Sequence, residues 1–271
     1  MVSVHRSRSQ RPQGLEFMAL TMLPRRRRML AYVLLGLLLA NSGFSQSAEE
    51  GTAKSLHERA KRGTADAQYK LGRMYDKGQG LKQDYTEALR WYRKAADQGQ
   101  ANAQFRLGGM YYEGRGVLQD YTEAARWLRK AADQGQANAQ FQLGLMYRHG
   151  RGLKQDYTEA TRWYRKAADQ GQADAQFILG LMYRHGRGVT QDYILAHKWF
   201  NLAASRATGE ENETWLTRVF SGWFWQSGWL SGVSQARAER ARDEVAAKMT
   251  ADQIAEAQRL AREWKPKTTE R

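Results

Sequence analysis

Two identical stretches, YRHGRG at residues 147–152 and 183–188, each carry a histidine that could bind a metal ion. His149 and His185 are 36 residues apart and occupy the same position of a repeated unit. Equivalent residues on stacked helices are separated by the distance between the helix axes, about 10 Å. Two ligands of one zinc ion must each come within about 2 Å of the metal. Copying of a whole unit therefore explains the two histidines better than a shared metal site.

Glycine pairs and acidic residues recur with the same period. The G-x-G at residues 78–80 resembles a phosphate-binding loop, but it follows a helical pattern and lacks the third glycine. Asp84 and Glu87 recur in the next two units, as helix-capping residues do. The chain has no cysteine, which excludes thiol nucleophiles, disulfides and cysteine metal sites. Neither G-x-S-x-G nor H-E-x-x-H occurs. We predict no catalytic, cofactor or metal site.

These residues belong to four consecutive units of 36 residues, which together span residues 65–208. Each unit predicts two amphipathic helices, and in the first unit Gly78 and Gly99 fall where those helices should end. One such pair cannot bury its own apolar stripe, so we expect the pairs to stack. The stripes of the first unit consist of Ala67, Leu71, Met74 and Tyr75, and then of Tyr85, Ala88, Trp91, Tyr92, Ala95 and Ala96.

The pattern A-x-A-Q-x-x-L-G-x-M-Y-x-x-G-x-G, followed by D-Y-x-x-A-x-x-W-Y-x-K-A-A-x-x-G, resembles the Sel1-like repeat family of the tetratricopeptide superfamily. The resemblance covers residues 65–208 and implies an all-α, right-handed α-solenoid that holds protein partners on a concave surface. Several exported bacterial members of this family are tied to envelope assembly, polysaccharide secretion or signalling. A subset with paired cysteines has been associated with penicillin binding, and the absence of cysteine argues against that activity here.

The first 48 residues have the pattern of a signal peptide and leader. Arg25–Arg28 precede an apolar run of 12 residues, and small residues then lead to a cleavage site near Ala48. The run is shorter than the roughly 20 residues of a membrane-spanning helix. We expect a periplasmic or secreted protein; the alternative is an uncleaved leader that anchors the protein in the inner membrane.

The formal net charge is +15, and residues 1–48 contribute +6 of it through seven Arg and one Glu. The remaining +9 favours acidic partners. The basic residues are spread through every repeat and mixed with acidic ones, which is typical of solvated helix faces. We therefore predict no nucleic-acid partner.

Flanking segments complete the predicted solenoid. Residues 49–64 predict an N-terminal capping helix, and residues 234–271 predict a C-terminal helical cap in which Thr250 and Gln253 form a capping box. Between repeats and cap, residues 209–233 form an aromatic insert. This insert either covers the last repeat as a hydrophobic cap or presents an exposed patch to a partner or a membrane surface. Its tryptophans of interest are Trp215, Trp223, Trp225 and Trp229.

Function should lie in the positions that vary between units. On the first helix of each unit these positions change from charged at the N-terminal end to apolar at the C-terminal end. In the last unit Ile194 and Leu195 replace Thr158 and Glu159 of the preceding unit, which should break its cap pattern. We predict that partner-binding residues in the repeats are Lys70, Arg73, Arg106, Leu145, Ile178 and Leu181.

The sequence thus predicts an exported protein–protein interaction scaffold that is not an enzyme. It would bind a partner on the solenoid groove and through the tryptophan-rich insert, with Lys70, Arg73 and Arg106 contacting acidic groups. The alternative is an envelope enzyme or a glycan-binding factor that acts on cell-wall or exopolysaccharide material. The aromatic insert would also allow peripheral contact with a membrane.

Overall fold

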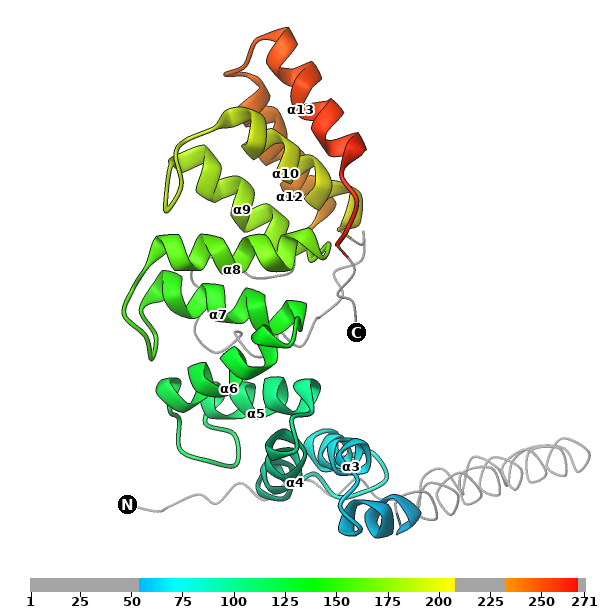
Figure 1. Ribbon diagram of the computed structural model, residues 1–271. Coiled ribbons are helices and arrows are strands. Elements are labelled where there is room, and N and C mark those ends of the chain that lie inside the picture. Colours follow the sequence, from blue (N-terminus) through cyan, green and yellow to red (C-terminus); the bar gives the residue numbers. More distant parts are fainter. Residues whose placement is uncertain (1–53, 208–232, 268–271) are drawn as a thin grey trace, which may run out of the picture. The chain divides into compact units, whose positions relative to one another are not determined.

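The computed structural model of the chain describes residues 54–207 and 233–267. Within these ranges every regular element is an α-helix, and Figure 1 shows the helices following one another along the chain. Helical residues 54–61 come first. The helices after them are α3 (Ala65–Lys77), α4 (Tyr85–Asp97), α5 (Ala101–Glu113), α6 (Tyr121–Asp133), α7 (Ala137–His149), α8 (Tyr157–Asp169), α9 (Ala173–His185), α10 (Tyr193–Arg206), α12 (Gln235–Ala246) and α13 (Ala251–Glu263).

The four predicted units are the helix pairs α3/α4, α5/α6, α7/α8 and α9/α10. Each helix packs against the next one, both within a pair and between successive pairs. This arrangement confirms the predicted α-solenoid of helix pairs. A hydrophobic core continues from one pair to the next because each second helix buries large side chains, among them Tyr92, Trp127, Tyr164 and Phe200. Burial of each such side chain stabilises the fold by about 1.5–3 kcal/mol.

Small residues on the first helices make room for these large ones. A β-carbon on Gly144 would lie 2.7 Å from the ring of Tyr164, so only glycine lets α7 and α8 approach this closely. At the N-terminal end, Leu56 and Ala60 pack with Leu71 and Trp91 in a separate cluster. Helical residues 54–61 thus contact the first unit through Leu56 and Ala60.

Both glycines of each G-x-G motif have a structural role in the turn between paired helices. Gly150 ends α7 in the left-handed conformation, with φ of 67°. Gly152 also has a positive φ, and a β-carbon there would lie 2.2 Å from the carbonyl oxygen of Tyr121 in the preceding unit. The second glycine is needed because the turn touches the neighbouring unit's backbone.

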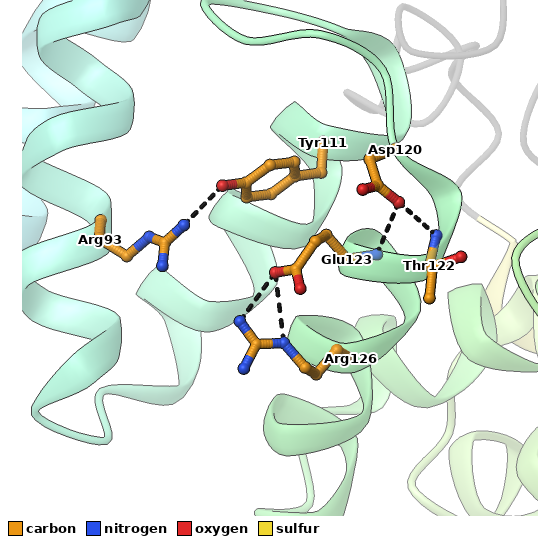
Figure 2. Close-up of polar contacts among 6 residues, drawn as sticks. All are labelled: Arg93, Tyr111, Asp120, Thr122, Glu123 and Arg126. Carbon is orange, nitrogen blue, oxygen red and sulfur yellow. Dashed lines mark hydrogen bonds and ion pairs between the residues drawn. The ribbon is translucent and has the colours of Figure 1, made fainter.

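The acidic pairs cap the second helices, but each pair forms only half of a capping box. Figure 2 shows Asp120 at the start of α6, where its carboxylate accepts hydrogen bonds from the backbone N–H groups of Thr122 and Glu123 at 2.8 and 3.0 Å. The Glu123 side chain binds Arg126 instead of returning to the backbone of Asp120. The reason is that the N–H of Asp120 already donates to the carbonyl of Tyr111 on α5.

Polar side chains also join successive units. Arg93 on α4 donates to the Tyr111 hydroxyl on α5 at 2.6 Å (Figure 2), and its guanidinium lies 5.3 Å from the centre of the Trp127 ring. The buried Gln104 side chain donates to the Ala96 carbonyl of the preceding unit at 3.1 Å. Both contacts repeat along the chain, in the arginine–tyrosine pairs Arg129–Tyr147 and Arg165–Tyr183 and in the glutamine–carbonyl pairs Gln140–Ala132 and Gln176–Ala168.

The last unit keeps its cap, contrary to the sequence prediction. Asp192 still accepts a hydrogen bond from the backbone N–H of Leu195 at 2.9 Å. The replacement of threonine and glutamate matters little because the donor is a backbone group. After the repeats, α12 and α13 both pack on α10. The predicted capping box of Thr250 and Gln253 forms at the start of α13.

Candidate protein-binding surface

The variable positions of the repeats lie on α3, α5, α7 and α9, the first helices of the four units. On α3, Lys70 is exposed and pairs with Asp66 at 2.7 Å. Arg73, one turn further on, is half-buried, and its guanidinium lies 5.9 Å from the centre of the Tyr69 ring. These two cations, together with the half-buried Arg106 on α5, form a group that we call the basic surface. It suits carboxylate groups of a partner.

An acidic pair lies at the C-terminal ends of the same two helices. Arg115 is paired with both Asp76, at 3.5 Å, and Glu113. The Tyr92 hydroxyl donates to the second carboxylate oxygen of Asp76 at 3.3 Å. Burial raises the pKa of Glu113, and the negative charge of Asp76 raises it further, whereas Arg115 and Arg106 oppose the shift. The Arg115 guanidinium thus pairs with both carboxylates, whereas the Glu113 Oε1 atom is buried with no hydrogen-bond partner.

The apolar residues predicted to bind a partner are mostly covered. Leu145 on α7 is 7% exposed and Ile178 on α9 is 5% exposed, and both belong to the continuous hydrophobic core. Leu181 is half-buried and packs against the same core. Sequence alone places all three on the variable face, but they stabilise the fold and offer a partner little surface. Among the predicted binding residues of the repeats, the exposed one is Lys70, at the N-terminal end.

Residues near the C-terminal end of the chain contact the side chains of α9. The backbone N–H of Val233 donates to Asp174 at 2.8 Å, and the Arg237 guanidinium lies 5.0 Å from the centre of the Phe177 ring. At the other end of α9, Arg184 pairs with Glu244 of α12 at 2.6 Å. Sequence reasoning missed these contacts because nothing local in residues 233–246 specifies which repeat they cover.

The other candidate residues have simpler outcomes. His149 and His185 are both exposed, and no group of three or more His, Cys, Asp or Glu side chains in the described ranges could hold a metal ion. The helices of those ranges include none long and apolar enough to span a membrane. The predicted insert tryptophans, Trp215, Trp223, Trp225 and Trp229, lie outside the described residues.

The repeats match a known family model. The Sel1 repeat model matches residues 65–100, 101–136, 137–172 and 173–207, which is more than half of the chain. The chain belongs to the Sel1 repeat family. Sel1 repeat proteins generally mediate protein–protein interactions, and the family is generally of a non-catalytic scaffold type. The predicted family and fold are therefore confirmed.

Solved Sel1 repeat structures resemble the chain over parts of their length. A Sel1 repeat protein from Oxalobacter formigenes is 39% identical, with a TM-score of 0.55, and the match covers 59% of this chain and 47% of that one. The uropathogenic Escherichia coli protective antigen c5321 is 27% identical, with a TM-score of 0.47, covering 78% of this chain and 48% of that one. The chain thus spans about half the length of these two proteins. No curated protein is a significant match.

Proposed function

We propose that this protein is an exported scaffold that recognises an acidic segment of a protein partner through the basic surface on α3 and α5. Membership of the Sel1 repeat family supports a role in protein–protein interaction. The observation that carries the finer proposal is the difference between the units. The variable positions on α3 are charged, with Lys70 exposed and Arg73 half-buried, whereas Leu145 and Ile178 are buried.

Charge complementarity favours an acidic partner. Lys70 has one exposed partner, Asp66, on its own helix, and such a pair contributes about 0.3–0.5 kcal/mol. A partner carboxylate can therefore compete for the Lys70 ammonium at little cost. Export is part of the proposal because Arg25–Arg28 precede an apolar run and small residues, as in a secretory signal.

Charge reversal tests the proposal. The variant Lys70→Glu/Arg73→Glu replaces the two cations that α3 contributes to the basic surface, and the matched control is Lys82→Glu/Lys154→Glu. The two control lysines are exposed loop residues, so both variants change the net charge by the same amount. Tagged proteins would be crosslinked in cells, recovered from the envelope fraction and compared by quantitative mass spectrometry.

We expect the α3 variant to lose at least about tenfold of a specific partner, while the loop variant retains it. Circular dichroism would show that both variants are folded. Equal recovery by the two variants would contradict a role for the basic surface. Recovery of the protein from the cytoplasmic fraction with an uncut leader would contradict export, independently of the partner result.

A further inference from the structure

A cavity lies where the last repeat meets the C-terminal helices. It has a volume of about 430 Å³ and is lined by side chains of α10, α12 and α13. These helices are not those of the basic surface, so the cavity is a separate feature. It is large enough for one amino-acid side chain or a small organic acid.

Several polar groups that line this cavity lack a partner. His197 on α10 is 3% exposed, and its Nδ1 atom is buried with no hydrogen bond. In the described part of the chain, the half-buried Asn201 and the exposed Gln258 and Arg262 make no hydrogen bond or ion pair with one another or with other residues, so their donor groups are available to a ligand. Buried polar groups are normally hydrogen-bonded, so the unpaired Nδ1 atom of His197 beside the cavity points to a missing partner.

The charges around the cavity indicate what that partner would be. Arg242 is already paired with Asp243 at 2.9 Å, so the Arg262 guanidinium supplies the uncompensated charge. Burial lowers the pKa of His197, and Arg242 lowers it further, whereas Asp243 opposes the shift. The imidazole is therefore neutral near pH 7 and acts as a hydrogen-bonding group. One net positive charge matches a ligand with one negative charge.

The shape of the donor groups narrows the ligand class. Arg262 presents a planar fork of N–H groups that matches a carboxylate, and Asn201 and Gln258 supply neutral amide donors. Ala246 and Ile254 add an apolar wall that a short hydrocarbon chain could contact. Phosphate, with close to two negative charges, would be repelled by the neighbouring Asp243.

We propose that the cavity between α10, α12 and α13 binds a carboxylate group carried by a short aliphatic chain, with Arg262, Gln258 and Asn201 as its hydrogen-bond donors. The same carboxylate chemistry is offered by a free organic acid and by the C-terminus of a protein. The site does not depend on the basic surface, so its failure would leave the proposed function untouched.

Isothermal titration calorimetry of the full chain tests the site with four probes: butyrate, acetylated trialanine with a free C-terminal carboxylate, its C-terminal amide, and inorganic phosphate. The variant Arg262→Gln removes the guanidinium group that is proposed to bind the carboxylate. The matched control is Arg259→Gln on the same helix, because Arg259 is exposed like Arg262 but pairs with Glu256 and Glu263 and does not line the cavity.

We expect saturable binding of at least one carboxylate probe, weakened about tenfold or more by Arg262→Gln and less than about twofold by Arg259→Gln. Both variants should keep the melting temperature of the wild type, apart from the small loss of exposed ion pairs at Arg259. Binding of butyrate alone identifies a free acid, and binding of the peptide acid but not of its amide identifies a protein terminus. The proposal is wrong if no carboxylate probe binds, if phosphate binds more tightly, or if Arg262→Gln binds as the wild type does.

Discussion

Replacement of Gly152 by alanine should destabilise the solenoid more than the same change at Gly150, two residues away. Both glycines have a positive φ, 66° and 67°, and an alanine in this region costs about 1–2 kcal/mol. At Gly150 the new β-carbon would lie 3.3 Å from the β-carbon of Gln155, which is a close contact but not an overlap. At Gly152 it would lie 2.2 Å from the Tyr121 oxygen and 2.7 Å from the Thr122 nitrogen, which are backbone atoms of another unit.

Backbone of a packed helix cannot move aside cheaply, so the overlap at Gly152 should add about 1–3 kcal/mol to the shared strain. We therefore expect a loss of about 1–2 kcal/mol for Gly150→Ala and about 2–5 kcal/mol for Gly152→Ala. The gain from restricting the unfolded chain is common to both variants and cancels in the comparison. Guanidinium unfolding followed by circular dichroism at 222 nm measures both losses.

Gly152 contacts the backbone of the preceding unit. The Gly152→Ala variant should therefore weaken the interface between these two units and broaden the unfolding transition. In stacked repeats the interfaces between neighbours carry the cooperativity. Equal destabilisation by the two alanine variants, with transitions of equal width, would refute this account of the second glycine.

Three further predictions concern single side chains. Asp120→Ala should lower the free energy of unfolding by about 1 kcal/mol, because two backbone N–H groups of α6 lose their acceptor. A denaturant titration that gives the same free energy of unfolding for the variant and the wild type would contradict this prediction. Gln104→Leu should cost about 1–3 kcal/mol, because it removes the donor to the preceding unit and strands the Gln134 amide; a neutral result would show that packing alone joins the units. The pKa of His197 is lowered in the folded protein, so the unfolded chain takes up the proton first, and stability should fall as the pH drops below about 6.5. His197→Asn should reduce this pH dependence, and unfolding at pH 7.5 and 5.5 would contradict the prediction if both proteins lost the same free energy.

Much of the fold follows from local pattern. Helix bounds, the left-handed ends at residues such as Gly78, and the Asp caps depend on interactions within a few residues, so spacing alone predicts them. Glu87 and its equivalents do not complete a capping box, and the reason is tertiary. The backbone N–H of Asp84 and of its equivalents already donates to a carbonyl on the first helix of the same unit. A local sequence pattern does not show whether a backbone N–H group already donates to an acceptor elsewhere in the fold.

The candidate site divides in the same way. Sequence by itself identifies the variable positions and their gradient from charged to apolar, because aligning four similar units shows directly which positions differ between them. Only the tertiary structure decides that Leu145 and Ile178 are buried whereas Lys70 stays accessible, since burial depends on what packs against each position.

The cavity beside α10 is a tertiary feature as well. Sequence determined that this protein is a stack of 36-residue helix pairs, because the period and the apolar stripes are local properties of the chain. The cavity is lined from α10, α12 and α13, whose residues His197 and Arg262 are far apart in sequence and share no motif. Such a site exists only where separate helices meet, and no spacing along the chain encodes that meeting.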